Sequence, residues 1–423
     1  MTVGELFSTA LRMGGVDEIF GVPFAGVHVV EVSDLAVAEV LALAHELVHR
    51  RTAFVHAGDG RFVRPNSHGS EGERRLGSVD EICELGGQLL TQPGPDSLSL
   101  ELDPQAPAVL GKWPDPPEPV GPDDPTDDLH TLIRSSEAPV VLAGPGIFDG
   151  GAVADLHALA AVANLGVLNT WGAKGLYDWR SRHHLATVGL QDQDFRLGGL
   201  AESDLIIATG LDSHEAPDKR WQISQFCTVA TTALARLSET IDRPRGEITQ
   251  PPLRAGLARV TQLGWKRSDA PLAPTKVTRQ YALSLGGSGL VAADAGIAGY
   301  WVARTFSTTS AGSAVVPSTP AQGLAVAAVI VARRIQPARL ALAVIDGVPD
   351  ELTLGLLAEA SRMGIGVGVE AWVSDGPRLD ATAHAERLRR LVVTPAQEVV
   401  GLSTDLHQID QMISVAGPVI AWT

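Results

Sequence analysis

A histidine, a glutamate and a second histidine have the spacing of a zinc-binding helix. His45, Glu46 and His49 lie in the sequence HELVH. This satisfies the H-E-x-x-H pattern, in which two histidines share one helix face and the glutamate acts as general base. The match contains only three fixed residues, and no third ligand stands out in the sequence. We therefore favour a partly buried histidine cluster over a zinc hydrolase.

A second group of candidates follows a buried apolar stretch. Residues 341–376 read ALAVIDGVPDELTLGLLAEASRMGIGVGVEAWVSDG, which predicts a strand, a turn, a helix and a second strand. Asp346, Asp350 and Glu351 gather where that helix begins. Acidic residues in a first helical turn interact favourably with the helix dipole. We favour this capping role over a relic metal site.

A third candidate is a glycine-rich turn, GPGIFDGG, at residues 144–151. It follows a predicted strand and precedes a predicted helix, as phosphate-binding turns do. FAD or an adenine nucleotide is therefore a candidate ligand of Gly144, Gly146 and Gly150. A lone glycine-rich turn is weak evidence, and the simpler interpretation is a tight strand-to-helix turn.

Composition excludes several classes of protein. The chain has 423 residues, a formal net charge of -16 and no basic run, so nucleic acid and anionic membranes are poor partners. Its two cysteines, Cys83 and Cys227, are far apart, which argues against a disulfide framework or a zinc knuckle. Thr2 and Glu5 predict a capping box that opens a helix rather than a signal peptide. We expect a soluble cytoplasmic protein with no membrane span.

Continuous apolar strands alternate with amphipathic helices along most of the chain, which predicts parallel strands covered on both faces. Residues 138–144 and 203–210 are examples of such strands, and residues 417–423 predict a terminal strand. We expect an α/β protein of three units that cover residues 1–111, 129–270 and 271–423. Residues 112–128, rich in proline and aspartate, predict a linker.

The order and wording of these segments resemble the thiamine-diphosphate (ThDP) enzymes of the acetolactate synthase and 2-oxoacid decarboxylase group. Residues 10–26 are similar to the family's opening helix and strand end, and residues 138–152, 171–190 and 202–210 resemble its central domain in order. The resemblance implies three Rossmann-like units, namely a pyrimidine-type, a central and a diphosphate-type domain. The family's SGPG loop and the strands after it are absent, so the first unit is expected to be truncated.

Magnesium binding is where the chain first departs from this family. The resemblance implies a Gly-Asp-Gly turn whose aspartate, with an asparagine after the next strand, holds the magnesium that neutralises the diphosphate. Asp346, Gly347 and Val348 occupy that turn, so Gly347 takes the place of the aspartate. Val373 and Ser374 take the place of the asparagines. Sliding the turn by one residue puts Asp346 at the metal position but leaves the second ligand missing.

The residues that would act on the cofactor ring also differ from those of the family. The resemblance implies a glutamate that protonates the aminopyrimidine ring, about two helical turns before an Ala-Asp-Gly step. The matching AGDG lies at residues 57–60. Counting back from it reaches Arg51, whereas counting forward from FGVP reaches Glu46. We favour Arg51, which cannot exchange a proton with the ring near neutral pH. Gln322 replaces the apolar residue that bends the cofactor.

These departures predict an acetolactate-synthase-like homologue that has lost ThDP and magnesium and has no metal site. It would act as a partner subunit, or as an enzyme with a repurposed cleft for a small molecule. One alternative is an active ThDP-dependent decarboxylase or carboligase that uses Glu46 and Asp346. The other is the zinc hydrolase built on His45, Glu46 and His49. We expect a homo-oligomer or a complex with a homologous subunit.

Overall fold

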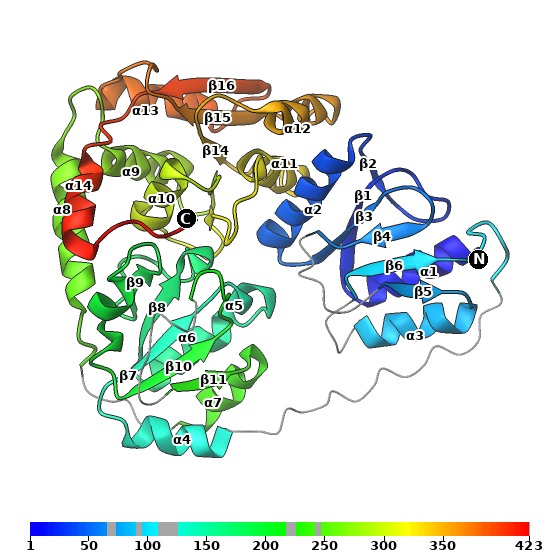
Figure 1. Cartoon of the computed structure of the whole chain (residues 1–423), viewed down its shortest axis with the longest axis horizontal. Helices are drawn as coiled ribbons and strands as arrows, with labels where there is room; N and C mark the ends of the chain where they lie inside the picture. The colour runs from blue at the N-terminus through cyan, green and yellow to red at the C-terminus, as the bar shows by residue number, and fades with distance from the viewer. Residues whose placement is uncertain (66–72, 90–94, 109–125, 217–225, 242–246, 423) are drawn as a thin grey trace. The chain divides into compact units, whose positions relative to one another are not determined.

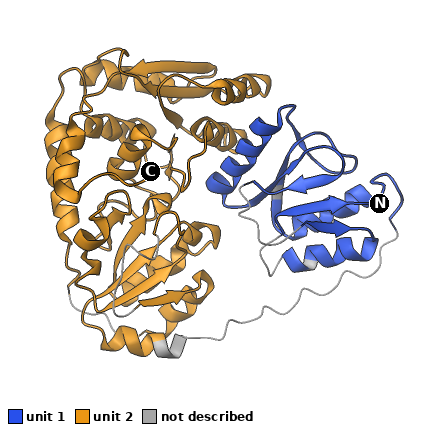
Figure 2. Ribbon diagram, in the orientation of Figure 1, with its two compact units in different colours: residues 1–123 blue, residues 124–423 orange. Residues whose placement is uncertain are grey.

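The chain divides into two compact units, Met1–Asp123 and Asp124–Thr423 (Figure 2). The computed structural model describes residues 1–65, 73–89, 95–108, 126–216, 226–241 and 247–422. The division falls within the stretch expected to be a linker, of which only residues 126–128 are described, as the start of a helix.

The first unit is built on a six-stranded mixed sheet. Its strands lie in the order β2 (Val30–Glu31), β1 (Val16–Gly21), β3 (Thr52–His56), β4 (Arg61–Val63), β6 (Ser97–Leu100) and β5 (Arg74–Leu76). β4 is antiparallel to both neighbours, and the other pairs are parallel. The helices are α1 (Val3–Met13), α2 (Leu35–His49) and α3 (Val79–Leu89). The predicted capping box of Thr2 and Glu5 is confirmed at the start of α1.

The second unit contains two parallel five-stranded sheets (Figure 1). The central sheet has the order β11 (Phe226–Val229), β10 (Leu205–Thr209), β7 (Pro139–Ala143), β8 (Gly166–Thr170) and β9 (His184–Val188). Helices α4 (Thr126–Ser135), α6 (Val153–Val162) and α7 (Leu234–Thr240) pack into the core on one face. On the other face lie the π-helical segment η2 (Arg196–Leu200), α8 (Pro252–Lys266) and α14 (Gln408–Ala416). Burial of both faces explains why the strands are apolar throughout.

The C-terminal sheet has the order β13 (Ala314–Val315), β12 (Leu290–Ala293), β14 (Ala341–Asp346), β15 (Val367–Trp372) and β16 (Gln397–Leu402). Helices α9 (Pro274–Leu285), α10 (Ile297–Thr305) and α13 (Ala381–Leu391) share the core on one face. Helix α11 (Leu324–Ile335) contacts β12 and β14, and α12 (Glu351–Arg362) packs beside it. β14, α12 and β15 follow one another along the chain. The strand, turn, helix and second strand predicted for residues 341–376 are therefore confirmed.

Buried polar contacts join the two sheets of the second unit. Gln191, which is fully buried after β9, donates from Nε2 to the carbonyl oxygens of Met412 (3.0 Å) and Gly417 (2.6 Å). Its Oε1 accepts a hydrogen bond of 2.9 Å from the hydroxyl of Tyr300 on α10. The predicted terminal strand at residues 417–423 is wrong for the described part. Instead, Val419 makes an isolated bridge with Gln191, because this segment pairs with a loop rather than with a sheet edge.

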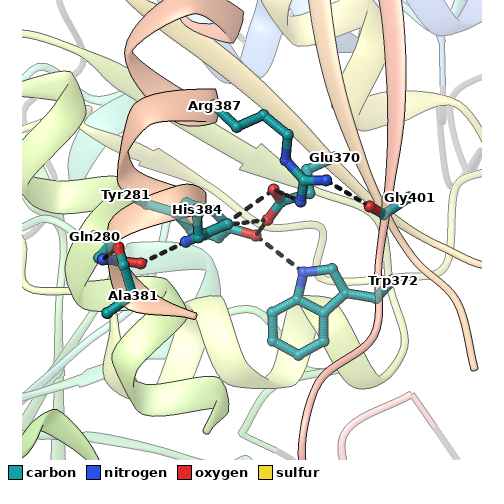
Figure 3. Close-up of polar contacts among 8 residues, drawn as sticks. All are labelled: Gln280, Tyr281, Glu370, Trp372, Ala381, His384, Arg387 and Gly401. Atoms are coloured by element: carbon teal, nitrogen blue, oxygen red, sulfur yellow. Dashed lines mark hydrogen bonds and ion pairs between the residues drawn. The ribbon is translucent and has the colours of Figure 1, made fainter. Parts of the chain in front are cut away.

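A buried carboxylate fastens two helices to β15 (Figure 3). Glu370 is fully buried and accepts hydrogen bonds from the Tyr281 hydroxyl, from His384 Nε2 (3.0 Å) and from Arg387 (3.0 Å). Tyr281 belongs to α9, and His384 and Arg387 belong to α13. Burial acts to raise the pKa of Glu370, but the neighbouring His384, Tyr281 and Arg387 outweigh it, and the pKa lies below its ordinary value.

The expected fold class is confirmed, because the chain is an α/β protein with three largely parallel sheets that correspond to Rossmann-like units of the ThDP-enzyme architecture. No helix in the described part of the chain is both long enough and apolar enough to cross a membrane.

We expect Glu370→Gln to lower the free energy of unfolding by about 3 kcal/mol at pH 7, because it disrupts a buried charged cluster. A carboxylate whose folded pKa is depressed stabilises the protein above its unfolded pKa, near 4.5, and this contribution is lost as the pH falls. The variant and the parent should therefore converge in acid. Urea unfolding at pH 7 and at about pH 2.5 measures the difference, with the exposed Glu386→Gln on the same helix as a control. Equal losses at both pH values would contradict the role of the charge.

Candidate functional site

Two carboxylates lie at the carboxyl ends of neighbouring strands in the C-terminal sheet. Asp346 is the last residue of β14, and Asp294 directly follows β12. β12 and β14 pair in parallel, with Ala293 opposite Val344, so both side chains emerge at the same edge of the sheet. In open α/β sheets this edge is where ligands bind. It is also the edge to which the predicted metal turn belongs.

Each carboxylate binds the N-terminus of a helix. Asp346 accepts the backbone N–H of Ala298, in the first turn of α10, at 3.0 Å and 3.2 Å from its two oxygens. Asp294 Oδ1 accepts the N–H of Ala325, in the first turn of α11, at 2.7 Å. Helix N-termini are the positions at which a parallel sheet offers N–H groups and positive dipoles to phosphates. At these two helices, carboxylates of the chain itself accept the N–H groups.

The two carboxyl groups sit in a setting that disfavours negative charge. Burial raises the pKa of Asp294 to about 6, and the neighbouring Asp350 and Asp346 add to the effect. Burial also raises the pKa of Asp346, against the opposing effect of its backbone hydrogen bonds. A further anion placed beside them would be repelled unless a cation accompanied it.

The turn after β14 lacks the expected magnesium aspartate. Gly347 has a φ of 72° and donates its N–H to the carbonyl oxygen of Trp372 at 2.9 Å. Val373, at the end of β15, donates its N–H to Leu402 and has no side-chain oxygen. Neither Gly347 nor Val373 therefore offers a side-chain oxygen to a cation at this edge.

Asp350, a second acidic residue of this turn, caps a helix. Asp350 accepts the N–H of Thr353 at 2.7 Å and is the N-cap of α12, so its predicted capping role is confirmed. Among the residues that the structure describes, no group of three His, Cys, Asp or Glu side chains could hold a metal ion. Gln322 lies exposed in the turn before α11. The acidic side chains at this edge are thus those of Asp294, Asp346 and Asp350, each of which accepts a backbone N–H at the start of a helix.

In the first unit, the structure places the two alternative activating residues on different elements. Glu46 lies in the last turn of α2 and its Oε1 accepts hydrogen bonds from Arg64 Nε (2.9 Å) and the Ala53 N–H (3.3 Å). Arg51 is exposed in the bend between α2 and β3. The residues from Arg51 to the AGDG step form β3 instead of two helical turns. The prediction of Arg51 counts about two helical turns back from AGDG, but a strand connects Arg51 to AGDG in the structure.

The histidines of the HELVH motif do lie on one face of α2. The rings of His45 and His49 are 5.0 Å apart between centroids, and His45 is fully buried near Phe20. Glu46, the would-be general base, is ion-paired with Arg64. No third metal ligand joins the pair within the described part of the chain. This arrangement matches the histidine cluster more closely than a zinc site.

The glycine-rich turn after β7 has no N–H left for a phosphate. The N–H of Gly146 donates to Gly210 at 2.9 Å and that of Gly144 to Thr209 at 3.0 Å. Each N–H from residue 147 to residue 152 also donates to a backbone carbonyl. A side chain at Gly144 or Gly146 would collide with the backbone of Gly210. Close approach of two strand ends therefore accounts for these glycines, and Gly150 faces Thr231 in the same way.

Three ionisable residues of the second unit were missed by the sequence analysis. Glu215 is fully buried, its pKa is raised to about 7 by burial, and its carboxylate accepts a hydrogen bond from Ser318. Lys174 is 6% exposed, and burial lowers its pKa to about 7, with a smaller contribution from Arg304. Asp294 had a readable signal, because it ends a buried apolar run just as Asp346 does. Lys174 and Glu215 lie in loops, where no periodicity marks burial.

Comparison with models of protein families gives a match in the second unit. Residues 126–235, from α4 to the start of α7, match the family model described as the thiamine pyrophosphate enzyme, central domain. This supports a relationship to the thiamine-diphosphate enzymes through the central sheet of the second unit. No curated protein matches the chain.

We expect Asp294→Asn to stabilise the protein at pH 7.5 by about 3 kcal/mol, since one pKa unit corresponds to 1.36 kcal/mol. The folded pKa, about 6, lies above the ordinary value of 3.8. Ionisation of Asp294 therefore destabilises the fold as the pH rises through this window and has no effect below it. Asparagine caps a helix about as well without the charge.

Thermal or urea unfolding at pH 4 and pH 7.5 tests this prediction, with the exposed Asp375→Asn as the control. The gain should be present at pH 7.5 and vanish at pH 4. A loss of stability at pH 7.5 would show that the charge at the α11 N-terminus is favourable.

We expect purified protein to contain zinc well below one ion per chain, because Glu46 is paired with Arg64 and the histidines lack a described third ligand. Elemental analysis by inductively coupled plasma mass spectrometry measures the content. Stoichiometric zinc that disappears in a His45→Ala/His49→Ala variant would instead support the hydrolase.

Proposed function

We propose that this chain is an acetolactate-synthase-like homologue of the ThDP enzymes that does not carry magnesium–ThDP. The observation that carries the proposal is the capping of α10 and α11 by Asp346 and Asp294. A diphosphate at this edge would have to displace both carboxylates from the helix N-termini. It would also lack the metal that reduces the repulsion between them.

The family relationship of the proposal rests on two different kinds of support. The match of residues 126–235 supports the ThDP-enzyme family at the central sheet. The narrower likeness to acetolactate synthases rests on the amino-acid sequence of segments such as residues 171–190. Loss of the cofactor is supported by Gly347, which has no side chain, and by Val373, whose side chain offers no oxygen ligand.

Two roles fit a homologue without its cofactor. The chain serves either as a subunit that associates with itself or with an intact homologue, or as an enzyme whose cleft takes another small molecule. Association is supported by apolar side chains exposed beside the β14 turn, namely Val348 (79% exposed) and Leu354 (55% exposed). Exposed apolar side chains mark interaction surfaces where they form a contiguous patch.

Calorimetric titration of the purified protein with ThDP and magnesium tests the proposal. We expect no saturable, magnesium-dependent heat, because the helix N-termini are already capped by carboxylates and position 347 has no side chain. A family member with an intact Gly-Asp-Gly turn, titrated under the same conditions, provides the positive control.

Saturable binding that requires magnesium would overturn the proposal and favour an active decarboxylase or carboligase. In that case Asp346→Asn should abolish the binding and Asp350→Asn should not, which would identify Asp346 as the metal ligand. Glu46→Gln would then be expected to remove the activity, since Glu46 is the remaining candidate for ring activation.

A further inference from the structure

A cavity of about 150 Å³ lies inside the second unit, between the central and C-terminal sheets. Its walls come from the loop after β8, from β9 and α8 on the central side, and from the end of α10 on the other. Its lining includes Lys174, His184, Arg254, Trp265, Arg304 and Phe306.

Basic side chains line this cavity, and none of its described lining residues is acidic. Lys174 is 6% exposed, and in the described structure its ammonium makes no hydrogen bond or ion pair. Arg254 donates only to the carbonyl oxygens of Trp179, Ser181 and His184. Burying a cation without an anionic partner is costly. When it is protonated, the Lys174 ammonium therefore lacks an anionic partner in the described lining, and the partly buried Arg254 adds a second positive charge.

The other two basic groups are already balanced. Arg304 pairs with the buried Asp194 at 2.6 Å and donates to the carbonyl oxygen of Thr187 at 2.9 Å. Nε2 of His184 donates to Asn169 Oδ1 at 3.0 Å. Burial lowers the pKa of His184 to about 3, with Lys174 and Arg254 adding to the effect, so the ring is neutral. The unbalanced positive charge of the cavity is thus that of Lys174 and Arg254.

Apolar side chains form part of the remaining walls, beside the polar side chains of Thr187, Thr261, Gln262, Thr305 and Ser307. The indole rings of Trp179 and Trp265 meet edge to face with centroids 5.8 Å apart, and Leu257 and Phe306 lie in the same lining. The Nε1 of Trp265 is buried and has no acceptor in the described structure. A buried donor without an acceptor is unfavourable and is satisfied when a ligand oxygen reaches it. The volume is sufficient for one benzene ring.

We propose that this cavity binds a small carboxylate with an apolar body. The carboxylate pairs with the ammonium of Lys174, close to the positive charge of Arg254, and the apolar body packs between the indole rings and Phe306. The proposal is independent of the loss of ThDP, since the cavity lies at residues other than those of the β12 and β14 strand ends.

A change in the protonation of Lys174 on binding would distinguish a ligand-binding lysine from one that only supports the fold. Burial and the nearby Arg304 lower the pKa of Lys174 to about 7, so a large share of the empty cavities hold a neutral amine at pH 7.5. The facing groups are His184, Arg254 and the Arg304–Asp194 pair, and only the last includes an anion. A bound carboxylate favours the charged amine, so binding above pH 7 is accompanied by proton uptake.

Titration calorimetry with benzoate, the neutral isostere benzamide and inorganic phosphate tests this site. We expect benzoate to bind saturably and the other two much more weakly, because one lacks the charge and the other lacks the apolar body. Lys174→Met should weaken benzoate binding by about tenfold or more, and should abolish the proton uptake seen when buffers of different ionisation enthalpy are compared. The exposed Lys266→Met on α8 is the matched control.

A second measurement needs no variant. Cyanate carbamylates neutral amines, so it should modify Lys174 ahead of exposed lysines, and benzoate should protect Lys174 alone, as read by peptide mass spectrometry. Absence of saturable benzoate binding, equal binding of phosphate, or unchanged affinity in Lys174→Met would overturn the proposal. Carbamylation of Lys174 at the same rate with and without benzoate would also overturn it.

Discussion

Parallel sheets place the N-termini of their helices at one edge, and the free N–H groups there must find an acceptor. In the C-terminal sheet that acceptor comes from the chain itself, because Asp346 caps α10 and Asp294 caps α11. Each aspartate ends one strand and holds a helix that follows a different part of the chain. The two contacts therefore fix the strand ends and both helices together, in the place where a bound phosphate group would otherwise perform this task.

Buried charge recurs in the second unit and is balanced in different ways. Glu370 is surrounded by donors from α9 and α13, and Arg304 is paired with Asp194 between the two sheets. Such clusters are costly to break because the remaining partner stays buried. They fix how helices and sheets fit together more than they add net stability. Lys174 and Arg254 differ, since their lining provides no anion, and this difference separates a binding cavity from a structural cluster.

The strands and helices of the second unit were readable from the sequence because fully buried parallel strands are apolar throughout. The α/β class with three largely parallel sheets followed from the same patterns, and the capping box at Thr2 followed from the spacing of Thr2 and Glu5. Side-chain roles were harder to predict. The choice of Arg51 assumed a helix where β3 runs, and the terminal residues pair with Gln191 instead of with a sheet. Asp346 was expected at the start of α12 but caps α10, since the sequence does not show which helix lies beside a strand end.

The turn at Gly347 has a consequence for the history and engineering of this chain. Its φ of 72° is one that aspartate and asparagine tolerate better than most residues. A side chain added there would meet no other atom within 4 Å. The backbone of this turn therefore has both the conformation and the space for an aspartate or asparagine side chain at position 347. A carboxylate at position 347 is a single substitution away, so this strand end is a ready scaffold in which to rebuild a cation site one ligand at a time.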